Sequence, residues 1–424
     1  MGQCTPMKYD GYMFKRLSLS HWRQFETVDL EFSDRLTVLT GENGTGKTTI
    51  LSVLSKHFGW NIGFVSLYHL SRKRKQKLLA DAWDMYESDT EEAPGSLPVG
   101  RITYSDESEC VLLMPPPNSP KQYQLTYKGN KAIHGIHIPS HTPSFSHYKV
   151  DSVPVNPLSS AEQYQKYRGL LQNLYLGASA ENPGREIKRS LISLAVFAGT
   201  TDFVQGNPEY QEVISGFQNK LQLLLPRSLG FERLVIDGSD IVFETSTGRF
   251  SLDAVSGGVG ALVGIAWQVY MYCLDKDSIV VTIDEPETHL HPSMQRELLP
   301  NLSRAFPTTQ FVVATHSPFI IASVPEAHVY ALTYGESRRV SSELLTETEL
   351  AGTANEILRE ILGVPLSVPI WVEERLVQLA EKYEAMPLTA ENLLALRREL
   401  QEAGLRALLP EALDIVGRPD AEDS

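Results

Sequence analysis

Alternation of apolar and polar residues marks several β-strands along the chain. Between residues 12 and 32, "YMFKRLSLS" and "FETVDLEF" alternate with a period of two, which predicts a β-hairpin. Short strands are also expected within "VGRITYS", "ECVLLMP", "KQYQLTYKG" and "AIHGIHIP", and again from Phe231 to Leu252. Helical spacing of apolar residues dominates from Ser159 to about Leu225 and after about Thr346.

The second half of the chain alternates buried strands with helices. An apolar helix from Gly258 to Leu274 precedes "SIVVTIDEPE" (Ser278–Glu287), and a helix to Phe306 precedes "QFVVATHSP" (Gln310–Pro318). Such alternation predicts a parallel sheet. We therefore expect an α/β fold with a parallel core sheet, an antiparallel N-terminal hairpin, a helical insertion and a helical C-terminal tail. The expected lobes are residues 1–64, 65–230, 231–345 and 346–424.

A glycine-rich loop joins the first core strand to a helix. "GENGTGKTT" follows the apolar "RLTVLT", precedes "ILSVLSKHF" and fits the G-x-x-x-x-G-K-[ST] pattern of a phosphate-binding loop. A plain glycine-rich turn is the alternative. In the functional interpretation, Lys47 reaches the β- and γ-phosphates of a nucleotide and the Thr48 hydroxyl binds Mg²⁺. The residues of this loop expected to bind nucleotide are Gly41, Glu42, Asn43, Gly44, Thr45, Gly46, Lys47, Thr48 and Thr49.

Two further strand ends carry polar residues suited to the same chemistry. Asp284 and Glu285 end one apolar strand, so Asp284 is expected to hold Mg²⁺ and Glu285 to polarise an attacking water. A capping aspartate at a helix start is the alternative. His316 ends the next strand, where it could hydrogen-bond a γ-phosphate, although a partly buried loop histidine is the alternative.

A second anion-binding helix start follows in the sequence. Ser256, Gly257 and Gly258 open the apolar helix, where a serine cap with glycines is the alternative. One chain cannot easily bring both helix starts to one nucleotide, whereas two chains arranged head to tail could. We therefore expect a homodimer, or a higher oligomer built from it. His289 and His291 could be drawn as metal ligands with Glu287, but we favour a loop that touches the dimer partner.

The order of these motifs resembles that of ABC-type ATPases, and within them the RecF, SMC and OLD branch. "LSLSHWRQFETVDLEF" is similar to the opening hairpin of that branch, with Trp22 and Arg23 as its aromatic–arginine pair, so the resemblance implies that Arg23 contacts the nucleotide. The signature reads "VSGGVGA" and lacks the glutamine of the transporter sequence "LSGGQ". Ser140 and His141 are the candidates in place of a glutamine loop.

The C-terminal tail refines this resemblance. "ANEILREILGVP" (Ala354–Pro365) and the compact length resemble the ATPase components of bacterial anti-phage systems such as Septu, in which a separate protein supplies the toxic activity. "IWVEERLVQLAEKY" (Ile370–Tyr383) has a glutamate like that of Toprim nucleases, but no later D-x-D follows it, so packing or partner binding is expected. The resemblance implies a Mg²⁺-dependent ATPase that controls an effector such as a nuclease or toxin. A RecF-like DNA-repair ATPase and an ATP-binding scaffold are the alternatives, and Glu285 argues against a scaffold.

Composition narrows the setting. The 424 residues are 42% hydrophobic and 21% charged, with no secretory pattern and no run of 18 apolar residues, so we expect a cytoplasmic protein without a membrane partner. Cys4, Cys110 and Cys273 suit reduced thiols. The net charge of −14 gives no support for nucleic-acid binding. "SRKRKQK" (Ser71–Lys77) opens a predicted helical stretch that ends near Tyr86; we favour a solvated face there, with a DNA contact as the alternative.

Overall fold

The chain divides into two compact units, residues 1–357 and 358–424. The computed structural model describes residues 11–70, 77–82, 95–116, 119–141, 145, 147–150, 152, 158–178, 181–200, 205–362, 370–384, 386, 389–409 and 412–413. The cations of the basic run at positions 72–75 lie outside these ranges. In the described ranges, no helix has both the length and the apolar character needed to cross a bilayer.

One mixed sheet organises the first unit, and its described strands follow the order β10-β8-β7-β1-β2-β18-β17-β3-β16-β15-β11. Their bounds are β1 Phe14–Trp22, β2 Phe25–Glu31, β3 Leu36–Gly41, β7 Leu97–Tyr104, β8 Glu109–Met114, β10 Thr126–Lys128, β11 Gly135–Ile138, β15 Ile279–Asp284, β16 Thr309–Ala314, β17 His328–Tyr334 and β18 Val340–Leu344. The predicted hairpin is confirmed as β1 and β2. The expected boundaries at 64, 230 and 345 fall inside this unit, because strands from all three lobes join the sheet.

The predicted parallel core is confirmed from β17 to β11, where all neighbouring strands run in the same direction. Strands β3, β15 and β16 are buried at every position, which is why they are continuous apolar runs rather than alternating ones. Helix α1 (Lys47–Ser55) packs against these three strands. Parallel strands bring their carboxyl ends to one edge of a sheet, so the loops after Gly41, Asp284 and Ala314 come together there.

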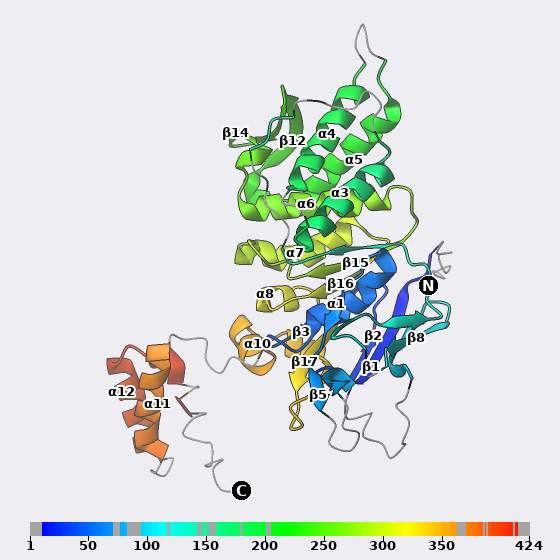
Figure 1. Cartoon of the computed structure of the whole chain (residues 1–424). Helices are drawn as coiled ribbons and strands as arrows, with labels where there is room; N and C mark the ends of the chain where they lie inside the picture. Colours follow the sequence, from blue (N-terminus) through cyan, green and yellow to red (C-terminus); the bar gives the residue numbers. More distant parts are fainter. Residues whose placement is uncertain are drawn as a thin grey trace, which may run out of the picture. The chain divides into compact units, whose positions relative to one another are not determined.

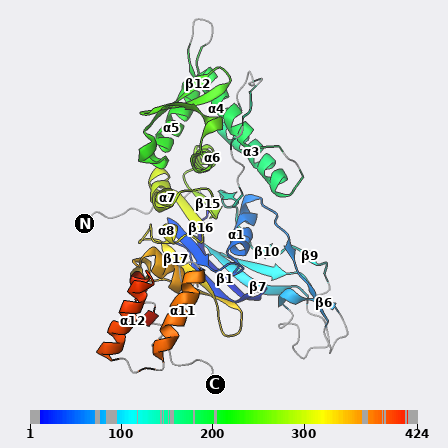
Figure 2. The same ribbon diagram turned by 90° about the vertical axis from the view of Figure 1, so that its left-hand side faces the viewer.

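A helical lobe extends beyond the end of the sheet that β15 and β11 form, as both ribbon views show (Figures 1 and 2). Its helices are α3 (Ser160–Tyr175), α4 (Gly184–Ala198), α5 (Pro208–Leu224), α6 (Gly257–Cys273) and α7 (Pro292–Ala305). The small sheet β12 (Phe231–Asp237), β13 (Asp240–Thr245) and β14 (Gly248–Ser251) completes the lobe. Helix α6 is apolar around most of its circumference because other helices of the lobe and β11 surround it.

The predicted helical stretch after the basic run is wrong where it can be followed. Lys77–Leu79 forms strand β6, which pairs antiparallel with β5 (Tyr68–Leu70) and is followed by the 3₁₀ turn η2 (Ala80–Ala82). Leu79 is fully buried opposite Tyr68. A cross-strand pair with a buried member stabilises the hairpin, so tertiary packing overrides the helical propensity of this lysine- and leucine-rich segment.

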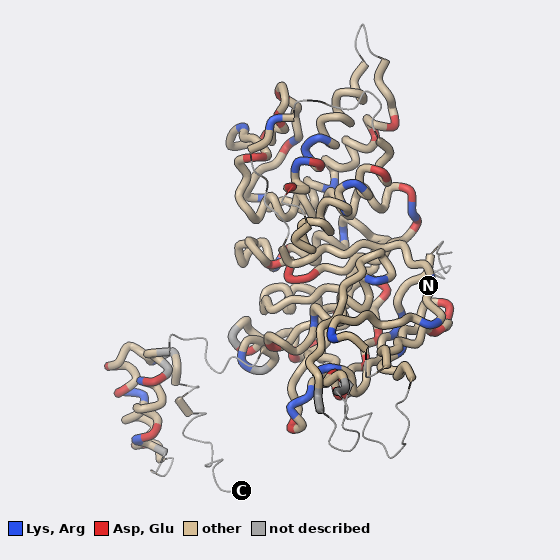
Figure 3. The backbone as a smooth tube through the Cα atoms, in the orientation of Figure 1, with Lys and Arg blue, Asp and Glu red and all other residues tan. Residues whose placement is uncertain are grey.

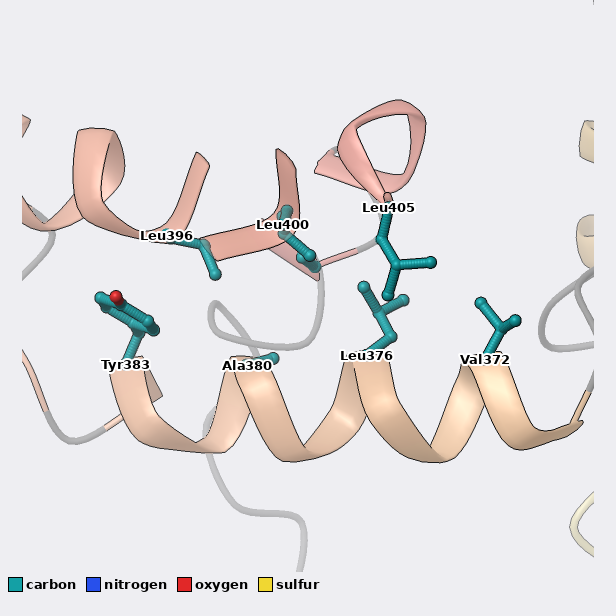
Figure 4. Close-up of a cluster of buried hydrophobic side chains, with 8 residues drawn as sticks. Val372, Leu376, Ala380, Tyr383, Leu396, Leu400 and Leu405 are labelled. Atoms are coloured by element: carbon teal, nitrogen blue, oxygen red, sulfur yellow. The ribbon is translucent and has the colours of Figure 1, made fainter. Parts of the chain in front are cut away.

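The second unit, residues 358–424, lies within the helical tail expected from residue 346 onwards. Helices α11 (Ile370–Glu384) and α12 (Ala390–Glu402) pack around a small apolar core with the turn η5 (Arg406–Leu408) (Figure 4). The core consists of Val372, Leu376, Ala380, Tyr383, Leu396, Leu400, Leu405 and Ala412. The Tyr383 hydroxyl donates a hydrogen bond of 3.0 Å to Glu399, which ties the end of α11 to α12. Short helices α9 (Glu347–Leu350) and α10 (Ala354–Glu360) come before α11 in the sequence.

Candidate functional site

Three loops at the carboxyl edge of the parallel sheet surround a cavity of about 210 Å³, here called the strand-end cavity. The loop between β3 and α1, the residue after β15 and the loop after β16 all contribute to it. Its lining residues are Gln24, Asn43, Gly44, Gly46, Lys47, Thr48, Thr49, Glu285 and His316. Residues from three separate sequence motifs are therefore brought together, and their chemical roles stay predictions.

The glycine loop adopts a conformation that side chains would obstruct. Gly41, Gly44 and Gly46 all have left-handed φ angles, of 129°, 86° and 98°. A Cβ atom on Gly46 would lie only 2.3 Å from Nε2 of Gln24. Glycine is therefore needed for the loop to adopt this conformation, which is the kind of turn that a phosphate loop requires.

Lys47 is buried at the centre of this loop. Its side chain donates hydrogen bonds to the carbonyls of Gly41 and Glu42, each at 2.9 Å. Burial lowers the pKa of Lys47 to about 8, against the opposing effect of the nearby Asp284 and Glu285 carboxylates. An anion bound in the loop would favour the charged ammonium, so the lysine fits a phosphate ligand.

Asp284 and Thr48 supply clustered oxygen atoms. The Thr48 hydroxyl donates a hydrogen bond of 3.0 Å to one carboxylate oxygen of Asp284, whose other oxygen is buried and has no hydrogen-bond partner among the described residues. Burial raises the pKa of Asp284 to about 6, although the Thr48 hydrogen bond opposes the shift. Hard oxygen ligands of this kind suit Mg²⁺, and the unpartnered oxygen is available to a cation.

Glu285 is held in an unusual backbone conformation. Its φ angle is 46°, which is costly for a residue with a side chain. Its N–H donates to the Ala314 carbonyl at 2.9 Å, and its own carbonyl accepts from the Thr288 hydroxyl at 3.0 Å. These bonds direct the carboxylate into the strand-end cavity, 3.8 Å from Nε2 of His316.

The loop that carries His316 is fixed by Glu287, whose role sequence reasoning missed. One carboxylate oxygen of Glu287 accepts the His316 N–H at 2.7 Å, while the other is buried without a described partner. Burial raises the pKa of Glu287, and burial together with Lys47 lowers that of His316. The only sequence signal for this role was the position of Glu287 two residues after Glu285, and a glutamate at that position is equally compatible with an exposed loop. Gln24, beside the glycine loop, carried no signal at all.

Other predicted residues lie outside the cavity lining. The Arg23 guanidinium lies 3.2 Å from the Asp81 carboxylate and donates to the Val65 carbonyl at 3.3 Å, so its nucleotide contact stays a prediction. Ser140 and His141 follow β11 and are not lining residues either.

The signature residues occupy a separate place. Ser256 caps α6, accepting the Val259 N–H at 3.4 Å, and a Cβ on Gly258 would lie 2.9 Å from the His289 carbonyl. The His291 ring lies 2.9 Å from the Ser293 hydroxyl, so the two histidines have different neighbours. None of the three signature residues lines the strand-end cavity.

A buried lysine stabilises the turn that leads to the signature. The Lys188 side chain on α4 is 1% exposed and donates to the Asp253 carboxylate and to the Tyr148 carbonyl, each at 2.6 Å. It also pairs with Asp240 of the small sheet. Asp253 belongs to the turn η4 (Leu252–Ala254), directly before the signature, so this network connects the helical lobe to the start of α6.

A phosphate-type loop on a parallel sheet, with carboxylates and a histidine at neighbouring strand ends, is the arrangement typical of P-loop nucleoside triphosphatases. The family model described as "AAA domain, putative AbiEii toxin, Type IV TA system" matches residues 128–322, and an "AAA domain" model matches residues 16–58. Both matches are to ATPase domains of the AAA type, and the relatives described below include anti-phage defence proteins, which supports the resemblance drawn from the motifs.

Known relatives match the chain over different lengths. The Septu protein PtuA of Bacillus thuringiensis is 20% identical over 391 residues, covering 85% of this chain and 87% of that protein. The Retron Vc95 probable ATPase of Vibrio cholerae serotype O1 biovar El Tor is 27% identical, covering 42% of this chain but only 34% of the relative. The Endonuclease GajA of Bacillus cereus (strain VD045) is 23% identical, with coverages of 83% and 64%. Among solved structures, the SMC head domain from Thermotoga maritima aligns with a TM-score of 0.41 and 15% identity, covering 78% of this chain and 98% of that domain.

Proposed function

We propose that the chain binds ATP with Mg²⁺ and hydrolyses it to ADP and phosphate. The observation that supports this most directly is the meeting of Lys47, Thr48, Glu285 and His316 at one cavity, with Asp284 bonded to Thr48. Lys47 and the glycine loop bind the phosphates, and Thr48 with Asp284 holds Mg²⁺, which when bound offsets phosphate charge.

Glu285 and His316 act on the terminal phosphate in this proposal. The Glu285 carboxylate accepts a hydrogen bond from the attacking water and takes up its proton. His316 has a pKa below its usual value, so at neutral pH its ring is largely neutral and can donate one hydrogen bond to the γ-phosphate.

Two variants test these assignments separately. Lys47→Ala should abolish ATP binding, measured by calorimetry, while the circular dichroism spectrum stays that of the folded protein. Glu285→Gln should still bind ATP but hydrolyse it about 10²- to 10⁴-fold more slowly, as expected for loss of a general base. Lys128→Ala, at an exposed lysine, is the matched control. Tight ATP binding by folded Lys47→Ala, or unchanged turnover by Glu285→Gln, would exclude the corresponding role.

We further propose a head-to-tail dimer in which Ser256 acts on the nucleotide held by the Lys47 of the other chain. The separation of the signature from the strand-end cavity supports this arrangement. Lys47→Ala and Ser256→Arg chains should each be inactive alone. Mixed, they should recover up to about a quarter of wild-type ATPase activity, because half of the dimers formed are mixed and each of these has one intact site. A monomer whose specific activity is independent of protein concentration would contradict the dimer, and ATP-induced dimerisation should be measured in parallel.

We also propose that the chain acts in the cytoplasm and controls a separate effector protein in anti-phage defence. The relatedness to proteins named for Septu and retron systems supports this. Cells that express the gene for this chain together with its neighbouring genes should lower the plating efficiency of phage, and Glu285→Gln should abolish that protection. Equal plating on both would count against the role.

A further inference from the structure

A second cavity, of about 410 Å³, lies in the helical lobe and shares no lining residue with the strand-end cavity. It is bounded by the end of α5, the 3₁₀ turn η3 (Arg227–Leu229) and one side of α7. Its walls include Arg227, Arg296 and Arg304 together with Glu297. We call it the arginine hollow.

The three arginines converge from two elements. Arg296 and Arg304 are eight residues apart on α7, so they lie along one side of that helix, and Arg227 reaches the hollow from η3. Lysines and arginines are otherwise interspersed with acidic residues along the described chain (Figure 3). The hollow is therefore a local concentration of positive charge in a protein of net charge −14.

Helix ends and hydrogen bonds within the chain explain one of these three arginines but not the other two. Arg304 is in the last turn of α7, where cations are favourable, and it donates to Asn301 at 3.1 Å. Arg296, in contrast, is an exposed residue beyond the first turn of the same helix, so neither helix end accounts for it. Within the described residues, neither Arg227 nor Arg296 has an ion pair or a side-chain hydrogen bond. Two guanidinium groups thus face the same hollow with their donors free for a ligand.

The rest of the lining indicates what kind of ligand fits. Guanidinium groups bind carboxylates and phosphates through paired N–H donors. Leu223, which is 38% exposed, Leu225 and Pro300 add apolar surface to the hollow. Glu297 repels any anion there, and it opposes a polyphosphate more strongly than a single carboxylate. A concave site of this size, with arginines beside apolar contacts, has the make-up of an anchor pocket at a protein interface.

We propose that the arginine hollow binds a short segment of a partner protein in which an aspartate or glutamate stands beside an aliphatic residue. The carboxylate pairs with Arg227 and Arg296, and the aliphatic side chain covers Leu223. The proposal rests on the proposed function in one respect: the arginine hollow would be the surface that the effector protein contacts. Binding does not require ATP hydrolysis, so the two proposals fail separately.

Selection from a displayed library of random dodecapeptides tests the proposal on the full chain. Peptides enriched on the wild type should carry Asp or Glu next to Leu, Ile or Val. The double variant Arg227→Gln/Arg296→Gln should bind them at least about tenfold more weakly, since two charge-assisted contacts are lost. Arg397→Gln/Arg398→Gln, on exposed positions of α12, makes the same charge change and should leave binding intact. Replacing the peptide carboxylates by amides should weaken binding as much as the arginine changes do.

Other outcomes of this experiment would contradict the proposal. Enriched peptides without acidic residues, equal binding to both double variants, or no enriched peptide would overturn the proposal. Binding of a single-stranded 20-nucleotide DNA that is lost in Arg227→Gln/Arg296→Gln, without peptide binding, would assign the hollow to nucleic acid instead. Lys47→Ala should bind the selected peptides as the wild type does, and the ATPase activity of Arg227→Gln/Arg296→Gln should be normal. A failure of ATP hydrolysis in the wild type would therefore leave the peptide result interpretable.

Discussion

Replacing Asp284 by asparagine should stabilise the nucleotide-free protein. Burial raises the pKa of Asp284 from its ordinary value of 3.8 to about 6, so the fold disfavours the ionised carboxylate. A tenfold change in acidity corresponds to about 1.4 kcal/mol, and the ionised side chain therefore destabilises the folded state by about 3 kcal/mol. The asparagine side chain would keep an acceptor for the Thr48 hydroxyl, which now donates to Asp284 at 3.0 Å, without this charge.

The effect of pH follows from the direction of the shift. Because the pKa in the folded state lies above the unfolded value, the penalty is small below about pH 4, grows between about pH 4 and 6, and is nearly complete above about pH 6. The gain in Asp284→Asn should therefore be about 3 kcal/mol at pH 7.5 and about half of that at pH 5.0. Magnesium and ATP should reverse the order, because a ligand that binds only the folded wild type stabilises it by mass action.

Urea unfolding of the first unit, followed by circular dichroism at both pH values, measures this difference. Asp34→Asn changes an exposed aspartate and should alter the free energy of unfolding little at either pH. An Asp284→Asn protein that is no more stable than the wild type at pH 7.5, or whose gain is equal at both pH values, would refute the reasoning. Stabilisation of both proteins to the same extent by Mg²⁺–ATP would refute the proposed ligand role of Asp284.

Two further variants test the supports of the site. Glu287→Ala leaves the partly buried His316 N–H without its acceptor, so it should lower stability by about 1–3 kcal/mol and reduce kcat more than it changes KM for ATP. Glu287→Gln should retain most of both, and equal effects of the two substitutions would argue against positioning through this bond. Lys188→Met should destabilise the protein to urea by about 3–5 kcal/mol because it leaves the Asp253 charge buried without its lysine partner, and adding Asp253→Asn should restore part of the loss. Unchanged unfolding would show that this buried network does not support the signature turn.

The features that could be predicted from the sequence are those that depend on short contiguous segments of the chain. The glycine loop and the strands ending at Asp284 and Ala314 could be recognised because a buried parallel strand is a continuous apolar run and a phosphate loop needs glycines at fixed places. The parallel core sheet followed from the alternation of such strands with helices. These are local signals, and the structure agrees with them.

Other features depend on contacts between residues far apart in the chain. Arg23 pairs with Asp81, 58 residues away, and nothing local to either residue predicts this. The bond from Glu287 to the His316 N–H crosses from one strand-end loop to the next, so it appears only once β15 and β16 are paired. Strand β6 likewise depends on its partner β5 rather than on its own helix-favouring composition.

The two largest opposing pKa shifts in the site have a common origin. Burial lowers the pKa of Lys47 to about 8 and raises that of Asp284 to about 6, so each group is held where its own charge is disfavoured. Their mutual attraction does not remove either shift, and Glu285 adds further negative charge beside Asp284. A phosphate favours the charged form of Lys47 and a cation favours that of Asp284, so only a ligand carrying both signs relieves both penalties. Metal-bound nucleotide has this property, whereas a metal-free nucleotide would add negative charge beside the carboxylates. The arrangement of charges thus supports the proposed Mg²⁺–ATP ligand over either component alone.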